Sequence, residues 1–131
     1  MRKSVKYLLY TVIFLVFICL TGLYALDRFF SGMCGNEIIV ETFSPDKQNK
    51  AVLFQRDCGA TTGFSTQISI INAKKNLPNE SGNVFIADGH PDDSNVKLQW
   101  LSPKKISIEI GLKKKVFKNE HQLNGIEIIY R

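Results

Sequence analysis

The segment DCGATTGF, at positions 57–64, holds the densest set of groups that could bind a ligand. Its glycines permit unusual dihedrals and let a ligand approach main-chain N–H groups closely. The candidate binding residues are Asp57, Gly59, Thr61, Thr62, Gly63 and Phe64. The alternative is a structural loop whose threonines hydrogen-bond the local backbone. A catalytic threonine needs an adjacent base, and the spacing supplies none, so we predict no catalytic residue.

A second polar segment, DGHPDD at positions 88–93, places one histidine and three carboxylates within six residues. Such a set could bind a divalent cation, but it lacks the spacing of a calcium-binding loop. A zinc site needs about three or four ligands, and the chain has only two histidines, His90 and His121. We therefore predict a solvated hairpin turn here, with no metal site and no cofactor.

Two of the three cysteines are candidates for a disulfide. Cys19 lies in an apolar run and is best read as a small apolar residue. Cys34 and Cys58 follow that run, and an even number in an oxidising compartment favours a disulfide. The link would close a loop of about 25 residues, worth roughly 3–4 kcal/mol. A reactive thiol is the alternative, although no C-x-x-C motif accompanies either cysteine.

A lysine-rich stretch near the C-terminus is the third feature that could carry a function. It contains Lys104, Lys105, Lys113, Lys114, Lys115 and Lys118. These lysines could contact anionic lipid heads, lipopolysaccharide or wall polymers. We favour the alternative, that they protect an edge strand from pairing with other chains. Because positions 27–131 hold 14 basic and 12 acidic residues, the composition argues against nucleic acid as a partner.

These segments follow 20 uncharged residues, Tyr7 to Leu26. As a helix they span about 30 Å, the thickness of a bilayer's hydrocarbon core. Three cations precede the run, which predicts a cytoplasmic N-terminus. We therefore predict a cytoplasmic tail (1–6), a single-pass signal anchor in the cytoplasmic (inner) membrane (7–26), a juxtamembrane segment (27–36) and an extracytoplasmic domain (37–131). A cleaved signal peptide is the alternative, but the run exceeds the usual length and Leu23 disfavours cleavage after Ala25.

The exported part shows apolar residues alternating with a period of two, which predicts strands. Turns are predicted at Ser44–Lys47, Ser102–Lys105 and Asn124–Gly125, and an exposed polar loop at 72–82. No soluble helix is evident. We therefore predict one all-β domain, an antiparallel sandwich or curled meander. The predicted strands cover 37–44, 50–57, 65–72, 83–88, 96–101, 106–110, 116–117 and 126–130.

Parts of this domain resemble a family of small, uncharacterised bacterial proteins, often membrane-anchored or lipoproteins. The resemblance is carried by CGNE (34–37), SPD (44–46), AVLFQRDCGATTGFSTQISI (51–70), NVFIADGH (83–90) and WLSP (100–103), with RDCGATTGF the most distinctive part. Lys47 stands where many relatives have Gly. The resemblance implies an exported domain with two cysteines, and no mechanism.

The function that we predict from the sequence is a non-enzymatic binding module at the bacterial cell envelope, with an envelope protein or polymer as its partner. A small envelope enzyme is one alternative, with Asp57, Thr61, Thr62 and His90 gathered around the Gly-rich loop. An immunity-type protein, which would inhibit a toxin or hydrolase, is another.

Overall fold

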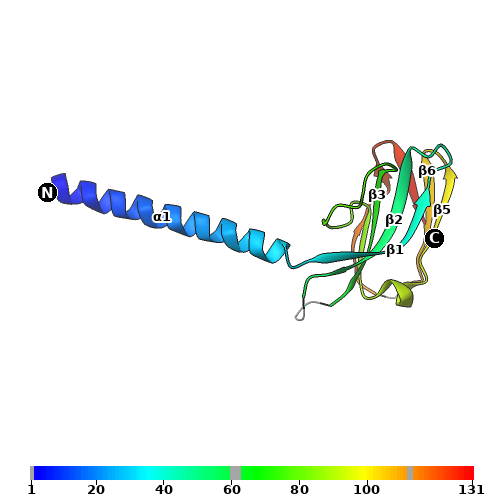
Figure 1. The fold of residues 1–131 in the computed structure, drawn as a ribbon, viewed down its shortest axis with the longest axis horizontal. Helices are drawn as coiled ribbons and strands as arrows, with labels where there is room; N and C mark the ends of the chain where they lie inside the picture. The colour runs from blue at the N-terminus through cyan, green and yellow to red at the C-terminus, as the bar shows by residue number, and fades with distance from the viewer. Residues whose placement is uncertain (1, 60–62, 112–113) are drawn as a thin grey trace. The chain divides into compact units, whose positions relative to one another are not determined.

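The computed structural model describes residues 2–59, 63–111 and 114–131. The chain divides after Met33 into two compact units, a helical one and a β-rich one. Figure 1 shows the helix α1 and the strands of the second unit. The predicted order of one N-terminal helix followed by an all-β domain is confirmed.

The first unit consists of α1, Arg2–Ser31, which extends beyond both ends of the predicted span. It is long and apolar enough to cross a membrane, and no part of its apolar window is buried against protein. The Thr11 and Thr21 hydroxyls donate to the carbonyls of Leu8 (2.8 Å) and Phe17 (2.9 Å). These two polar groups are therefore satisfied within the helix, as a hydrocarbon environment requires.

The second unit consists of two sheets. One has the strand order β1-β2-β3-β4-β7, and the other has the order β5-β6-β9-β8. The strands β6 and β9 are parallel, and the other pairs among the described strands are antiparallel. The bounds are β1 Gly35–Phe43, β2 Asn49–Asp57, β3 Ser65–Asn72, β4 Phe85–Asp88, β5 Lys97–Ser102, β6 Lys105–Glu109, β7 Val116–Asn119, β8 Gln122–Leu123 and β9 Ile126–Tyr130.

The hydrophobic core draws on both sheets. Leu53 and Ile68, which are opposite each other in β2 and β3, contribute from the first sheet. Ile106, Ile108 and Ile128 contribute from the second sheet, and all of these side chains are buried. The alternation of each strand places these residues on one face, so the core lies between the sheets.

Part of the outer face of the first sheet is also buried, although the segment 72–82 is largely exposed, as predicted. Val52 and Phe54 of β2 are fully buried although they point away from the core. The segment 73–84 lies beside β3 on the side away from β5 and β6 (Figure 1). Because its main chain binds residues of that face, including Asn36 and Gln67, we infer that it covers Val52 and Phe54.

This covering segment is fastened to β3 by a close backbone approach. The Gly82 N–H donates to Gln67 Oε1 (2.6 Å). A Cβ at Gly82 would lie 2.8 Å from the carbonyl oxygens of Ile68 and Phe85, so only glycine fits there without displacing the backbone. The Asn83 side chain continues the contact, accepting from Ile70 N and donating to Ile70 O, each at 2.9 Å.

Two local elements differ from the prediction. The chain from Pro91 to Ser94 forms a 3-10 helix rather than a hairpin turn, and the Ser94 hydroxyl donates to His90 O (2.9 Å). Proline suits the first position of such a turn because it needs no N–H donor there.

The strand β8 was not predicted, because two residues are too few to show alternation. The predicted Asn124–Gly125 turn joins β8 to β9, with φ of 48° and 79°.

Candidate functional site

The predicted disulfide is present and joins Cys34 to Cys58. Gly35 pairs with Asp57 at the start of the β1–β2 ladder, so the cysteines lie one position beyond that pair. The disulfide therefore fastens the beginning of the β domain to the end of its second strand. This end of β2 and β3 is called the disulfide end below.

The candidate binding loop at the disulfide end is described only in part, because Thr61 and Thr62 lie outside the described residues. The Asp57 carboxylate accepts a hydrogen bond from Gly59 N (2.9 Å). Gly59 has φ of 116°, which favours glycine. Gly63 is exposed and lies next to Asp88, with 4.0 Å between an added Cβ and the carboxylate. One carboxylate oxygen of Asp57 thus stabilises the local turn by accepting the hydrogen bond from Gly59 N.

Phe64, the last residue of that loop, stacks on His90 with ring centroids 4.1 Å apart. Gly89 N donates to Phe64 O (2.9 Å), and the Thr66 hydroxyl donates to Gly89 O (2.8 Å). His90 therefore lies at the same end of the sandwich as Asp57, as an enzyme built on this loop would need. Asp57 accepts a hydrogen bond from Gly59 N, whereas His90 packs on Phe64, so the described contacts of these two side chains are with different partners.

The two histidines belong to separate aromatic contacts. His121 packs edge-on against Tyr130, with centroids 5.2 Å apart, whereas His90 packs on Phe64. Within the described part of the chain, no group of three His, Cys, Asp or Glu side chains is placed to hold a metal ion.

Arg56 stabilises the disulfide end through hydrogen bonds of its side chain. Its guanidinium donates to Asn36 Oδ1 (2.6 Å) and Asn79 Oδ1 (3.1 Å), and Asn79 Nδ2 donates to Cys34 O (2.8 Å). Burial lowers the pKa of Arg56 below its ordinary value, and the charge of Glu80 opposes that effect. This arginine holds β1, β2 and the segment 73–84 together, so its role is structural.

The lysine-rich stretch is divided among several contacts. Lys105 forms an ion pair with Glu127 (3.2 Å), and Lys115 lies over the Phe117 ring, 5.2 Å from its centroid. Lys118 lies in β7, at the edge of the five-stranded sheet, as the edge-strand interpretation expected. Lys113 lies outside the described residues. Lys104 belongs to a different feature, a pocket at the opposite end of the domain.

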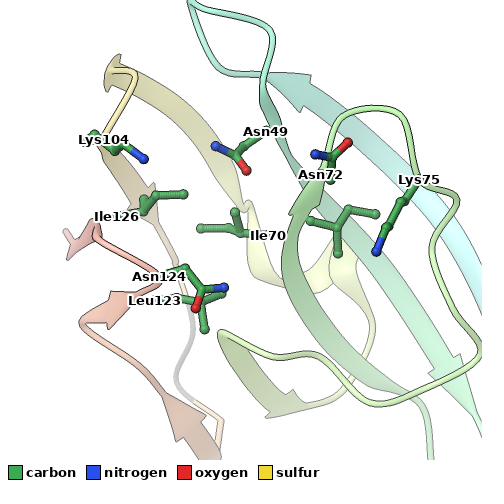
Figure 2. A pocket seen from close by; sticks show the side chains of 9 residues that line it. Asn49, Ile70, Asn72, Lys75, Lys104, Leu123, Asn124 and Ile126 are labelled. Atoms are coloured by element: carbon green, nitrogen blue, oxygen red, sulfur yellow. The ribbon is translucent and has the colours of Figure 1, made fainter.

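This pocket of about 380 Å³ lies where the two sheets separate, away from the disulfide end. Figure 2 shows two lysines and two asparagines in the upper part of the view, Ile126 and Ile70 below them, and Asn124 beside Leu123 lower down. The first sheet supplies the start of β2 and the end of β3, and the second supplies the β5–β6 and β8–β9 turns. It is lined by Asn49, Ile70, Ile71, Asn72, Lys75, Lys104, Leu123, Asn124 and Ile126. We call it the inter-sheet pocket.

The inter-sheet pocket has a positive rim. Neither Lys75 nor Lys104 takes part in a salt bridge with any described residue. Lys104 interacts electrostatically with Asp46. The pKa of Asp46 is lowered first by a hydrogen bond from the Ser44 hydroxyl (2.6 Å), next by one from Gln48 N, and also by the charge of Lys104.

The sequence analysis missed this pocket. Its polar residues are scattered from position 49 to position 124 and form no motif. Only two weak indications of a polar site were present in the sequence. They are a lysine in the predicted Ser102–Lys105 turn and asparagines beside the ends of predicted strands. Pairing of the strands is what brings these positions together.

Comparison with known proteins gave no match, either among family models, among curated proteins or among solved structures. The resemblance to a family of exported bacterial proteins therefore stays a prediction.

Proposed function

We propose that this chain is a single-pass membrane protein of the bacterial cell envelope that displays a ligand-binding β-sandwich outside the cytoplasmic membrane. An apolar helix without protein burial supports the anchor. The cations at its N-terminus support a cytoplasmic tail. The Cys34–Cys58 disulfide supports an extracytoplasmic domain, because structural disulfides persist in oxidising compartments.

The inter-sheet pocket is the observation that carries the binding role. Its rim offers two ammonium groups and three side-chain amides above an aliphatic floor. Ammonium groups and amides suit holding a ligand by charge and hydrogen bonds. We therefore favour a non-enzymatic binding module over a catalyst.

Labelling of intact cells with a membrane-impermeant maleimide tests the topology. We would use a Cys19→Ser chain, so that only Cys34 and Cys58 can react. We expect labelling only after treatment with an impermeant reductant. A Ser4→Cys variant of the same chain is the control, and its added thiol should react only after lysis. Reaction of Cys34 and Cys58 only after lysis would place the domain in the cytoplasm and overturn the proposal.

A further inference from the structure

We propose that the inter-sheet pocket binds a phosphorylated sugar or polyol. This inference deepens the proposed binding function by naming its site and its ligand class. Three properties of the pocket support this ligand class. Two lysines line it, the side-chain amides of its asparagines have donors or acceptors that no described residue uses, and its floor is aliphatic.

The cations approach from opposite sheets. Lys75 follows β3, and Lys104 lies in the β5–β6 turn; both line the pocket and lie at opposite sides of the view in Figure 2. Glu127 pairs with Lys105, and Asp46 accepts hydrogen bonds from Ser44 and Gln48 while also interacting with the charge of Lys104. Among the residues that the structure describes, no acidic one lines the pocket. Two ammonium groups facing one space favour a phosphate group, for which lysine is a common ligand.

The asparagines supply hydrogen bonds suited to hydroxyl groups. Asn49 makes no side-chain hydrogen bond with another described residue, and its main chain is held by Ser44. Asn72 uses Oδ1 to accept from Lys74 N (3.0 Å), which leaves its amide N–H groups for a ligand. A side-chain amide both donates and accepts, as a hydroxyl does, so these groups complement a polyol.

The floor of the pocket is aliphatic. Ile70 and Ile126 are core residues, 5% and 3% exposed, and Leu123 packs against the same core. Aliphatic side chains can contact the C–H face of a sugar ring, and a mostly apolar wall with a few placed polar groups is the usual composition of a small-molecule site. The volume of about 380 Å³ lies in the lower part of the range of roughly 300–1,000 Å³ found for such sites.

Local backbone contacts hold the rim in place before any ligand arrives. Lys75 N donates to Asn72 O (3.0 Å), and Lys104 N donates to the Ser102 hydroxyl (3.2 Å). Asn124 occupies a left-handed position in a two-residue turn. A preorganised rim loses little entropy on binding.

Calorimetry on the full-length chain in detergent micelles tests this inference. The probes are glucose 6-phosphate, glucose and inorganic phosphate. We expect glucose 6-phosphate to bind most tightly, and each of Lys75→Gln and Lys104→Gln to raise its Kd by about tenfold or more, as expected for loss of a charged hydrogen bond. Lys74→Gln, which changes the neighbouring exposed lysine outside the pocket, should leave the Kd unchanged.

Equal binding of glucose would overturn the role of the phosphate, and equal binding of inorganic phosphate would overturn the role of the amides and floor. Failure of all three probes to bind, or an equal loss in Lys74→Gln, would overturn the site itself. Melting temperatures should be the same in all variants, because these lysines are exposed. The labelling experiment decides the location independently, so a cytoplasmic domain that still binds glucose 6-phosphate would refute the topology alone.

Discussion

Arg56 shows how a charged residue beside a Gly-rich loop can serve the fold. In the sequence it directly precedes the candidate binding loop. In the structure it is 9% exposed and its hydrogen bonds go to Asn36 and Asn79. A guanidinium suits this position because it presents several donors in a fixed plane.

We expect Arg56→Gln to lower the free energy of unfolding by about 2 kcal/mol, because it removes two hydrogen bonds donated by a charged group. Urea unfolding followed by fluorescence of Trp100, the one tryptophan of the chain, measures this change. Lys97→Gln is the control, since Lys97 is 73% exposed in a 3.7 Å ion pair and should contribute less than about 0.5 kcal/mol. Equal stability of both variants would contradict the role given to Arg56.

Strand pairs are the scale at which the sequence was most informative. Alternation predicted β3 with its observed bounds, and it predicted β2 and β9 to within one residue. The predicted loop at 72–82 is largely exposed, but the sequence did not show that this segment also contacts the sheet through its main chain and Gly82. The inter-sheet pocket was likewise out of reach, since it depends on which strand ends become neighbours.

The disulfide between β1 and β2 permits a prediction at this scale. We expect the Cys34→Ser, Cys58→Ser double variant to be less stable by about 3 kcal/mol, because the unfolded chain gains the freedom of a 24-residue separation. The same urea titration measures this loss, and chemical reduction of the wild type should reproduce it. Cys19→Ser should unfold like the wild type. Wild-type stability in the double variant would show that the link has no energetic role.

For the whole domain, Tyr130 of β9 is one of the residues that link its two sheets. Its hydroxyl donates to Glu120 O (2.8 Å) and to Val84 O (3.3 Å) beside the first sheet. Burial, followed by the charge of Glu120, raises the pKa of Tyr130 from 10.0 to about 12. The folded state therefore favours the protonated phenol.

Because the pKa of Tyr130 is raised in the folded state, the free energy of unfolding falls as the pH rises. The contribution of the neutral phenol to stability is complete below pH 10 and is lost as the pH rises through about 12. We expect unfolding free energies measured over that interval to fall more steeply for the wild type than for Tyr130→Phe. Parallel curves for the two chains would contradict the assignment.

The position of Cys34 at the entrance to the domain has a mechanical consequence. β1 is an edge strand, and it is the strand to which α1 is connected. Without a cross-link, tension arriving along the chain would separate β1 from β2 by breaking ladder hydrogen bonds one after another. The disulfide lies before the first pair of that ladder, so part of the force passes directly into β2, a strand paired on both sides. A β domain pulled through α1 is thereby protected from unzipping at the β1 edge.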